Sequence, residues 1–313
     1  MRRINPLELV GNEKFDFDLY DDKEEIVYRN GDPLTPDVLI KLNHKKIFVK
    51  ELITDESFDF EPANKSKNPV IFTHKPLISE DATKNLVKNA KTILKKAYNN
   101  EKPDTSIFIE TTDIILEEVN KNLEKIDCIS QLRIFDEYTF SHTINVSTMS
   151  SALGITLKLQ EHEIKELALG ALLHDIGKML VPKDILNKPA KLDPDEFEIM
   201  KSHTLLGYRY IIENLNVADK VAKVALDHQE KYSGGGYPYG LKGKEINLYA
   251  QIASVADVYD ALISNRVYKR AFESGKAIEI MIEEGDKSFN PYMLSKFLEI
   301  TDYKNKSEFK PQT

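Results

Sequence analysis

The sequence has a single cysteine, no apolar run long enough to cross a membrane and no excess of basic residues. One cysteine, Cys128, excludes an internal disulfide framework, and its amphipathic surroundings favour the role of a small buried hydrophobic residue. The formal net charge of −8 argues against a binder of duplex nucleic acid, which needs a basic face. The N-terminal segment also has no apolar run of signal-peptide length. We therefore expect a cytoplasmic protein that does not insert into a membrane.

The chain length of 313 residues suits one large domain plus a smaller one. Residues 1–60 pattern as a small α+β module, with strands in 14–21 and 45–52 and a short helix over 35–43. This module is expected to bind a regulator or a partner. A linker over 61–78, a helical domain over 79–300 and a flexible tail over 301–313 are expected to follow. The predicted fold class is mainly α, an all-helical bundle after the small module.

Several helices of the large domain are predicted from caps and periodicity. Ser79 begins one helix, and Asp193 with Pro194 and Glu196 forms a capping box at the start of another. The stretch 161–180 is apolar over most of its surface, so we predict one continuous, central, buried helix there. The stretch 248–264 is a second apolar helix, and a glycine-rich loop over 233–246 precedes it.

Residues with side chains that hold divalent metals recur in these helical stretches. A lone histidine on an apolar helix is more often a hydrogen-bonded core residue than a ligand. An aspartate inside an apolar helix, however, needs a cation or hydrogen-bond donors. The candidate ligands are His142, His174, Asp175, His203, His228 and Asp257.

The densest part of this pattern is His174-Asp175-Ile176-Gly177-Lys178. Adjacent helical residues point about 100° apart, so both His174 and Asp175 reach one pocket only if the helix end faces it or if Asp175 bridges two ions. On a helix Lys178 shares the face of His174, where an ammonium would neutralise the charge that develops on a phosphodiester. Four histidines and two aspartates can hold two ions about 3.5–4 Å apart. The sequence therefore predicts a metal-dependent hydrolase of phosphate esters, with iron, manganese or zinc favoured over magnesium.

The motifs together resemble the HD-GYP family, a branch of the HD phosphohydrolases that hydrolyses cyclic di-GMP. The resemblance covers about 125–300 and is carried by "HDIGK" at 174–178, "HQEKYSGGGYPYGLKGKEI" at 228–246 and "ASVADVYDALISNRVYKR" at 253–270. It implies an HD-type helical bundle and a phosphodiesterase that uses a metal-activated water to give pGpG, GMP or both. It also implies two divalent transition-metal ions, iron first, with manganese or zinc as alternatives.

The resemblance further implies a role for each matching position. The six candidate ligands match the metal ligands of the family, with Asp175 as the bridging carboxylate and catalytic together with Lys178. Lys178 matches the lysine that contacts the scissile phosphate. The remaining substrate-binding positions are Arg266, Lys269 and Tyr237, the last within the signature Gly236-Tyr237-Pro238.

Three positions depart from the family pattern. Gln229 stands where a second histidine ligand is usual, so Gln229 is kept as a further candidate ligand that offers only a neutral amide oxygen. Ser233 replaces an aspartate, a change expected to loosen the loop together with Gly234-Gly235-Gly236. Tyr138 occupies a position where members with a third metal carry a glutamate, so we expect two metals.

These departures leave alternatives open. The first is a cyclic di-GMP phosphodiesterase whose activity Gln229 and Ser233 weaken. The second is a catalytically impaired domain that binds cyclic di-GMP or a signalling partner. An HD phosphohydrolase that acts on another phosphoester is a third. Expected partners are cyclic di-GMP and diguanylate cyclases of the GGDEF type or other signalling proteins.

Overall fold

The computed structural model describes residues 2–4, 19–20, 26–28, 47–49, 77–99, 101–123, 129–134, 138–186, 188, 191–264 and 271–301. It divides into two compact units, one of residues 1–60 with 95–102 and one of residues 61–94 with 103–313. The predicted helix over 35–43, most of the predicted linker and nearly all of the tail lie outside the described residues. The predicted domain limits stay predictions.

The first unit contains a four-stranded antiparallel sheet. Its strands are β1 (Arg2–Ile4), β2 (Leu19–Tyr20), β3 (Ile26–Tyr28) and β4 (Ile47–Val49), in the order β1-β4-β2-β3. β2 and β4 lie within the two strands predicted from the sequence. The register places Leu19 opposite both Tyr28 of β3 and Val49 of β4.

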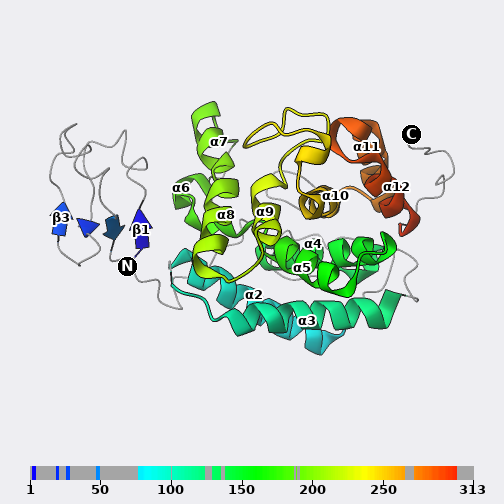
Figure 1. The fold of residues 1–313 in the computed structure, drawn as a ribbon, viewed down its shortest axis with the longest axis horizontal. Helices are drawn as coiled ribbons and strands as arrows, with labels where there is room; N and C mark the ends of the chain where they lie inside the picture. Colours follow the sequence, from blue (N-terminus) through cyan, green and yellow to red (C-terminus); the bar gives the residue numbers. More distant parts are fainter. Residues whose placement is uncertain are drawn as a thin grey trace. The chain divides into compact units, whose positions relative to one another are not determined.

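The second unit is helical, which confirms the predicted fold class (Figure 1). Its helices up to residue 172 are α2 (Glu80–Tyr98), whose residues 95–98 are grouped with the first unit, α3 (Thr105–Asn122), the 3-10 helix η4 (Ile129–Leu132), α4 (Tyr138–Thr156) and α5 (Glu161–Leu172). The later elements are η5 (Ile176–Leu180), α6 (Lys183–Leu186), α7 (Pro194–Lys201), α8 (His203–Asn214), α9 (Asp219–Asp227), η6 (Gly243–Glu245), α10 (Leu248–Ile263), α11 (Ser274–Ser288) and α12 (Pro291–Glu299). None of the helices in the described part of the chain is long and apolar enough to span a membrane.

Helices α4, α5 and α10 form the core of this unit. α4 packs on α5 and on α10, and α3 covers α4 and α5 from one side (Figure 1). Ile144, Met149 and Leu153 of α4 are fully buried. The predicted apolar helix over 248–264 is confirmed as α10. Polar side chains of α10 such as Gln251, Ser254 and Asp260 are buried with it, so each is held among packed neighbours.

The capping box predicted at Asp193 is present. The Glu196 N–H donates to the Asp193 carboxylate at 2.9 Å, and the Asp193 N–H donates to the Glu196 carboxylate at 2.8 Å. Pro194 is the first residue of α7, as expected. The stretch after this box is broken at Ser202, so that α7 and α8 are separate helices and His203 begins the second.

The continuous helix predicted over 161–180 is wrong. α5 ends at Leu172, and His174 and Asp175 lie in a turn that leads into η5. The carbonyl of Ala171, which an α-helix would pair with the N–H of Asp175, instead faces Nδ1 of His174 at 2.8 Å. The backbone then continues through tighter bonds, such as Lys178 N–H to the Asp175 carbonyl at 3.0 Å. Because the helix ends before Asp175, its side chain does not have to point about 100° away from that of His174, as it would on a continuous helix.

Candidate metal centre

Five helical segments of the second unit bring the candidate ligands to one place. Each candidate ligand lies on a helix, at the end of a helix or in the turn between α5 and η5. Helices α4, α5 and α10 pack against one another. The positions are His142 on α4, His174 and Asp175 between α5 and η5, His203 at the start of α8, His228 just after α9, and Asp257 on α10.

Asp175 lies at the centre of this cluster. Its Oδ2 atom lies 3.7 Å from Nε2 of His142 and 3.4 Å from Nε2 of His174. Its Oδ1 atom lies 3.5 Å from Nε2 of both His203 and His228. Each carboxylate oxygen thus faces a different pair of histidines, which is the arrangement that a carboxylate needs to bridge two ions.

All four histidines point the same ring nitrogen toward the centre. Nδ1 of each ring faces an oxygen acceptor of the protein, which favours a proton on Nδ1 and turns Nε2 toward the cluster, where Nε2 of His142 also lies 3.3 Å from Oδ1 of Asp257. The acceptors are the carbonyls of Ala171 for His174 (2.8 Å), Met200 for His203 (2.7 Å) and Ala225 for His228 (3.0 Å), and the Asp260 carboxylate for His142 (2.8 Å).

Asp260 is a functional residue that the sequence analysis missed. It is fully buried on α10, and its other oxygen accepts hydrogen bonds from Nε of Arg133 at 2.7 Å and from Asn145 at 3.2 Å. Burial raises the pKa of the Asp260 carboxyl, but the charge of Arg133 and the hydrogen bond from His142 outweigh it and lower the pKa. Asp260 therefore stays ionised and orients His142.

The electrostatic environment of the cluster favours the protonation states that bind cations. Burial raises the pKa of Asp175 and of Asp257, but the charge of Lys178 on Asp175, and the approach of Nε2 of His142 to within 3.3 Å of Asp257, hold both below the usual range. Burial lowers the pKa of His203 to about 3, so its imidazole is neutral at neutral pH. Ionised carboxylates and neutral imidazoles are the forms that bind metals.

The residues fit a divalent-metal site. Within the described part of the chain, Nε2 of His174 and Oδ1 of Asp175 are buried without a hydrogen-bond partner, a costly state that coordination to a cation would remove. Three overlapping groups have ligand atoms within 4.8 Å of one another. These groups are His142 with His174 and Asp175, His174 with His228 and Asp257, and Asp175 with His203 and His228.

Lys178 lies beside the cluster on η5. Its Nζ atom lies 2.5 Å from Oδ2 of Asp175, and about a third of its side chain is exposed. The sequence predicted that Lys178 lies on the same helical face as His174. In the structure the 3-10 turn instead directs it to Asp175, three residues earlier, so it adds a positive charge next to the Asp175 carboxylate.

The glycine-rich loop is folded against the end of α9. The buried Glu230 accepts hydrogen bonds from the N–H groups of Tyr239 at 2.7 Å and Leu241 at 3.0 Å, a role that the sequence analysis missed. A Cβ atom on Gly236 would lie 2.4 Å from Cα of Glu230, so only glycine fits there. Both the N–H and the hydroxyl of Ser233 donate to the Lys287 carbonyl, at 3.1 and 2.9 Å. Ser233 thus connects the loop to the end of α11.

Tyr237 brings this loop to the ligands. Its ring lies 6.2 Å from the ring of His203, edge to face. The carbonyl of Gln229 accepts a hydrogen bond from the Tyr237 N–H at 3.2 Å, so residue 229 is at the base of the loop directly after His228. Arg266, Lys269 and the side chain of Tyr138 lie outside the described residues, so their predicted roles stay predictions.

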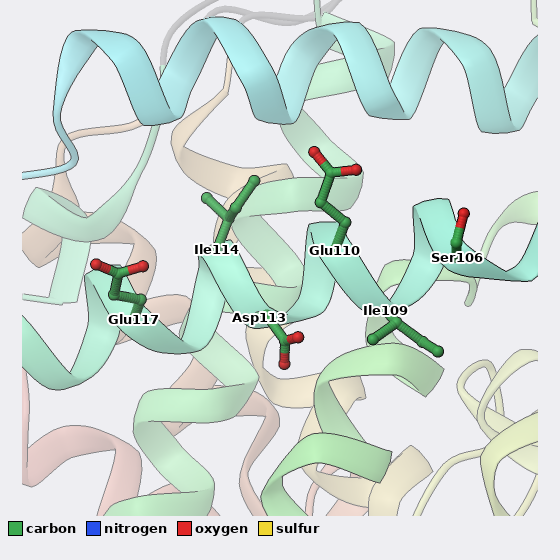
Figure 2. Close-up of a pocket in the computed structure, with 6 residues that line it drawn as sticks. All are labelled: Ser106, Ile109, Glu110, Asp113, Ile114 and Glu117. Carbon is green, nitrogen blue, oxygen red and sulfur yellow. The ribbon is translucent and has the colours of Figure 1, made fainter.

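A separate open hollow of about 430 Å³ lies on α3 (Figure 2). It is lined by Ser106, Ile109, Glu110, Asp113, Ile114 and Glu117. None of the candidate ligands belongs to α3, and the lining side chains carry no histidine or basic group. The hollow has no role in the metal centre.

The sequence of the chain is similar to a known protein family and to several characterised proteins. A family model described as "HD domain" matches residues 112–292. The chain is 37% identical over 195 residues to "Cyclic di-GMP phosphodiesterase PA4108" of Pseudomonas aeruginosa, an alignment that covers 62% of this chain and 47% of that protein. It is 36% identical over 217 residues to "Cyclic di-GMP phosphodiesterase" of Thermotoga maritima, covering 68% and 57%. The chain thus spans about half the length of the curated relatives it matches.

A solved structure shares the fold. Bd1817 of Bdellovibrio bacteriovorus, described as an HDG"Y"P protein, superposes with a TM-score of 0.58 at 20% identity, covering 95% of this chain and 98% of that one. The family model covers more than half of this chain and includes all six candidate ligands. The chain belongs to the HD domain family, and the HD-GYP resemblance of its motifs is confirmed.

Proposed function

We propose that this chain is a metal-dependent cyclic di-GMP phosphodiesterase. The observation that carries the proposal is the position of Asp175, whose two oxygens face two different pairs of histidines. The names of the relatives from Pseudomonas aeruginosa and Thermotoga maritima support the substrate. Hydrolysis adds one water across one phosphodiester bond and yields linear pGpG, and a second hydrolysis yields GMP.

The residues fall into two ligand sets that share Asp175. One ion would be held by His142, His174, Asp175 and Asp257, and the other by Asp175, His203 and His228, with Gln229 as an additional candidate. Two such ions lower the pKa of water and stabilise the negative charge of a phosphate. The mixture of imidazole and carboxylate ligands favours iron, manganese or zinc over magnesium, and the resemblance to the HD-GYP family puts iron first among the three.

The chain's own groups would position the substrate. Lys178 places an ammonium beside Asp175, where it meets a phosphate oxygen of a bound diester. The ring of Tyr237 lies 6.2 Å from the ring of His203 in an edge contact, and Arg266 and Lys269 are further candidates for contact with the phosphates. Burial raises the pKa of the Tyr237 hydroxyl, so it remains a neutral hydrogen-bond donor.

The test uses protein purified anaerobically and loaded with iron or manganese. Incubation with cyclic di-GMP should give pGpG or GMP, separated by chromatography, and Asp175→Ala should abolish the product because both ions lose a ligand. Metal content of both proteins is measured in the same samples. The proposal is contradicted if wild-type protein with full metal content forms no more product than the Asp175→Ala control.

A second candidate is favoured by Gln229. Its amide oxygen is a weaker ligand for a transition metal than imidazole, which points to a domain that binds cyclic di-GMP but turns it over poorly. Gln229→His should then raise both the metal content and the rate. Equal metal content and rate in the two proteins would show that Gln229 impairs neither metal binding nor turnover, and would rule out the impaired domain as the function.

A further inference from the structure

Helix α7 exposes an aromatic ring next to the metal centre. Each of its residues, all of which the structure describes, keeps part of its surface in solvent. Phe197 is 46% exposed and Ile199 is 41% exposed, although both are large and apolar. Ligand sites are lined mainly by apolar and aromatic side chains, so an exposed ring next to the candidate site can contact a ligand.

A row of rings connects Phe197 to the ligands. The ring of Phe197 lies 6.4 Å from the ring of Tyr237, with an interplanar angle of 79°. Tyr237 in turn lies 6.2 Å from His203. Phe197 therefore lies two ring contacts from a candidate metal ligand, while nearly half of its surface stays open to solvent.

Lys201 adds a cation to the same surface. Its Nζ atom lies 5.1 Å from the centre of the Phe197 ring and 5.7 Å from the centre of the Tyr237 ring. It is also ion-paired with Glu198 at 2.5 Å. The combination of an open aromatic face and a cation suits a ligand that carries both a flat base and a phosphate.

We propose that Phe197 is a stacking platform for one guanine base of the cyclic dinucleotide. The inference rests on the proposed function, because it requires one phosphate of the substrate at the Asp175 cluster. The sugar attached to that phosphate then lies beside Tyr237, between the Asp175 cluster and Phe197, and the base lies on the exposed face of the Phe197 ring. Stacking on an aromatic ring accepts any base, so this contact adds affinity while the selection of guanine belongs to other groups.

The chain offers matched variants for a test. Phe197→Ala removes the ring, Phe197→Leu keeps an apolar cover over Tyr237 without an aromatic face, and Phe197→Trp keeps the face. Ile199→Ala removes a side chain of similar exposure from the same helix and serves as the control. Because both side chains keep more than a third of their surface in solvent, the variants should retain the wild-type melting temperature and metal content, and these two quantities are measured first.

The experiment is calorimetric titration of the manganese-loaded full chain with a slowly hydrolysed phosphorothioate analogue of cyclic di-GMP, and separately with ribose 5-phosphate, which has no base. Phe197→Ala and Phe197→Leu should weaken the dinucleotide about tenfold, equivalent to about 1.4 kcal/mol. Phe197→Trp and Ile199→Ala should bind it as wild type does. Ribose 5-phosphate should bind equally to all five proteins.

The outcomes separate this inference from the proposed function. Wild-type affinity in Phe197→Ala, or rescue by Phe197→Leu, overturns the stacking role and leaves the phosphodiesterase intact. Weaker binding of ribose 5-phosphate to Phe197→Ala would place the effect at the metals and equally overturn the stacking role. Failure of wild-type protein both to bind the analogue and to hydrolyse cyclic di-GMP overturns the proposed function and this inference with it.

Discussion

Asp260 lies one helical turn after Asp257 and accepts the Nδ1 proton of His142 at 2.8 Å. Its second oxygen pairs with Arg133 at 2.7 Å, and both side chains are almost completely buried. A buried pair of this kind contributes little stability by itself, since desolvation offsets the attraction between the charges. Its effect is to fix the tautomer and the direction of the imidazole of His142, a candidate metal ligand.

Asp260→Asn should therefore weaken metal binding more than it changes the fold. An amide offers one acceptor where the carboxylate serves both His142 and Arg133, so one of the two partners loses its acceptor. Loss of such a hydrogen bond typically costs 10–100-fold in metal affinity, and we expect about that change in the dissociation constant for manganese. The measurement is competition with a fluorescent chelator. Asp113→Asn, on the exposed face of α3, is the control, and equal affinities would contradict the orienting role of Asp260.

Glu230 acts at the same scale on the glycine-rich loop. Glu230→Gln leaves one acceptor for the two N–H groups of Tyr239 and Leu241, and an unpaired buried donor costs about 1–3 kcal/mol. We expect faster hydrogen exchange at the Tyr239 and Leu241 amides, with amides of α4 unchanged. Glu161→Gln, whose side chain is 86% exposed, should leave all these rates as in wild type. Unchanged exchange in Glu230→Gln would show that the loop does not depend on this carboxylate.

The sequence indicated the candidate ligands more readily than the residues that support them. Asp257 attracted attention because it is an aspartate in an apolar helix, and the same reasoning applied equally to Asp260 in that helix. Glu230 gave no such signal, since its acceptor role depends on how the loop folds back over it. The carbonyls that hold His174, His203 and His228 depend on backbone geometry and are invisible in a sequence.

At the scale of elements, the turn between α5 and η5 is the part that periodicity could not predict. The apolar pattern of 161–180 continues through it, because η5 is also buried and its apolar residues face the core. The signal for the turn was Gly177. A Cβ atom there would lie 1.9 Å from the carbonyl oxygen of His203 and 2.4 Å from the nitrogen of Gly207. Contact of η5 with α8 therefore requires a residue without a side chain, and this contact places Asp175 beside His203.

Gly177→Ala should separate η5 from α8. The backbone atoms that a methyl group would meet cannot move aside cheaply, so we expect a loss of about 3 kcal/mol or more in the free energy of unfolding, at the upper end of overpacking effects. Chemical denaturation measures this value, and elemental analysis should show reduced metal content. The matched control is Gly275→Ala in the first turn of α11, where a Cβ atom meets nothing within 4 Å. Equal stability of the two variants would contradict the close approach.

At the scale of the whole molecule, the ligands come from segments between residues 142 and 257 that meet only in the folded chain. A ligand that binds the folded state alone stabilises it by mass action, so metal binding and folding are coupled. Without metal, the same packing holds ionised carboxylates and the neutral imidazole of His203 in a largely buried cluster. The stability of the metal-free chain should consequently depend on pH.

The direction of that dependence follows from His203. Burial lowers its pKa from 6.5 to about 3, so below pH 6.5 the unfolded chain takes up a proton that the folded chain refuses until about pH 3. The contribution of this group to stability is fully present above pH 6.5 and is lost progressively as the pH falls toward 3, with a slope of at most about 1.4 kcal/mol per pH unit. Urea denaturation in the presence of chelator at pH 7.5, 6.5, 5.5 and 4.5 measures the free energy of unfolding. His203→Gln removes the titrating group, so its stability should fall less steeply over this range, whereas parallel curves for the two proteins would show that the imidazole of His203 titrates normally in the folded chain.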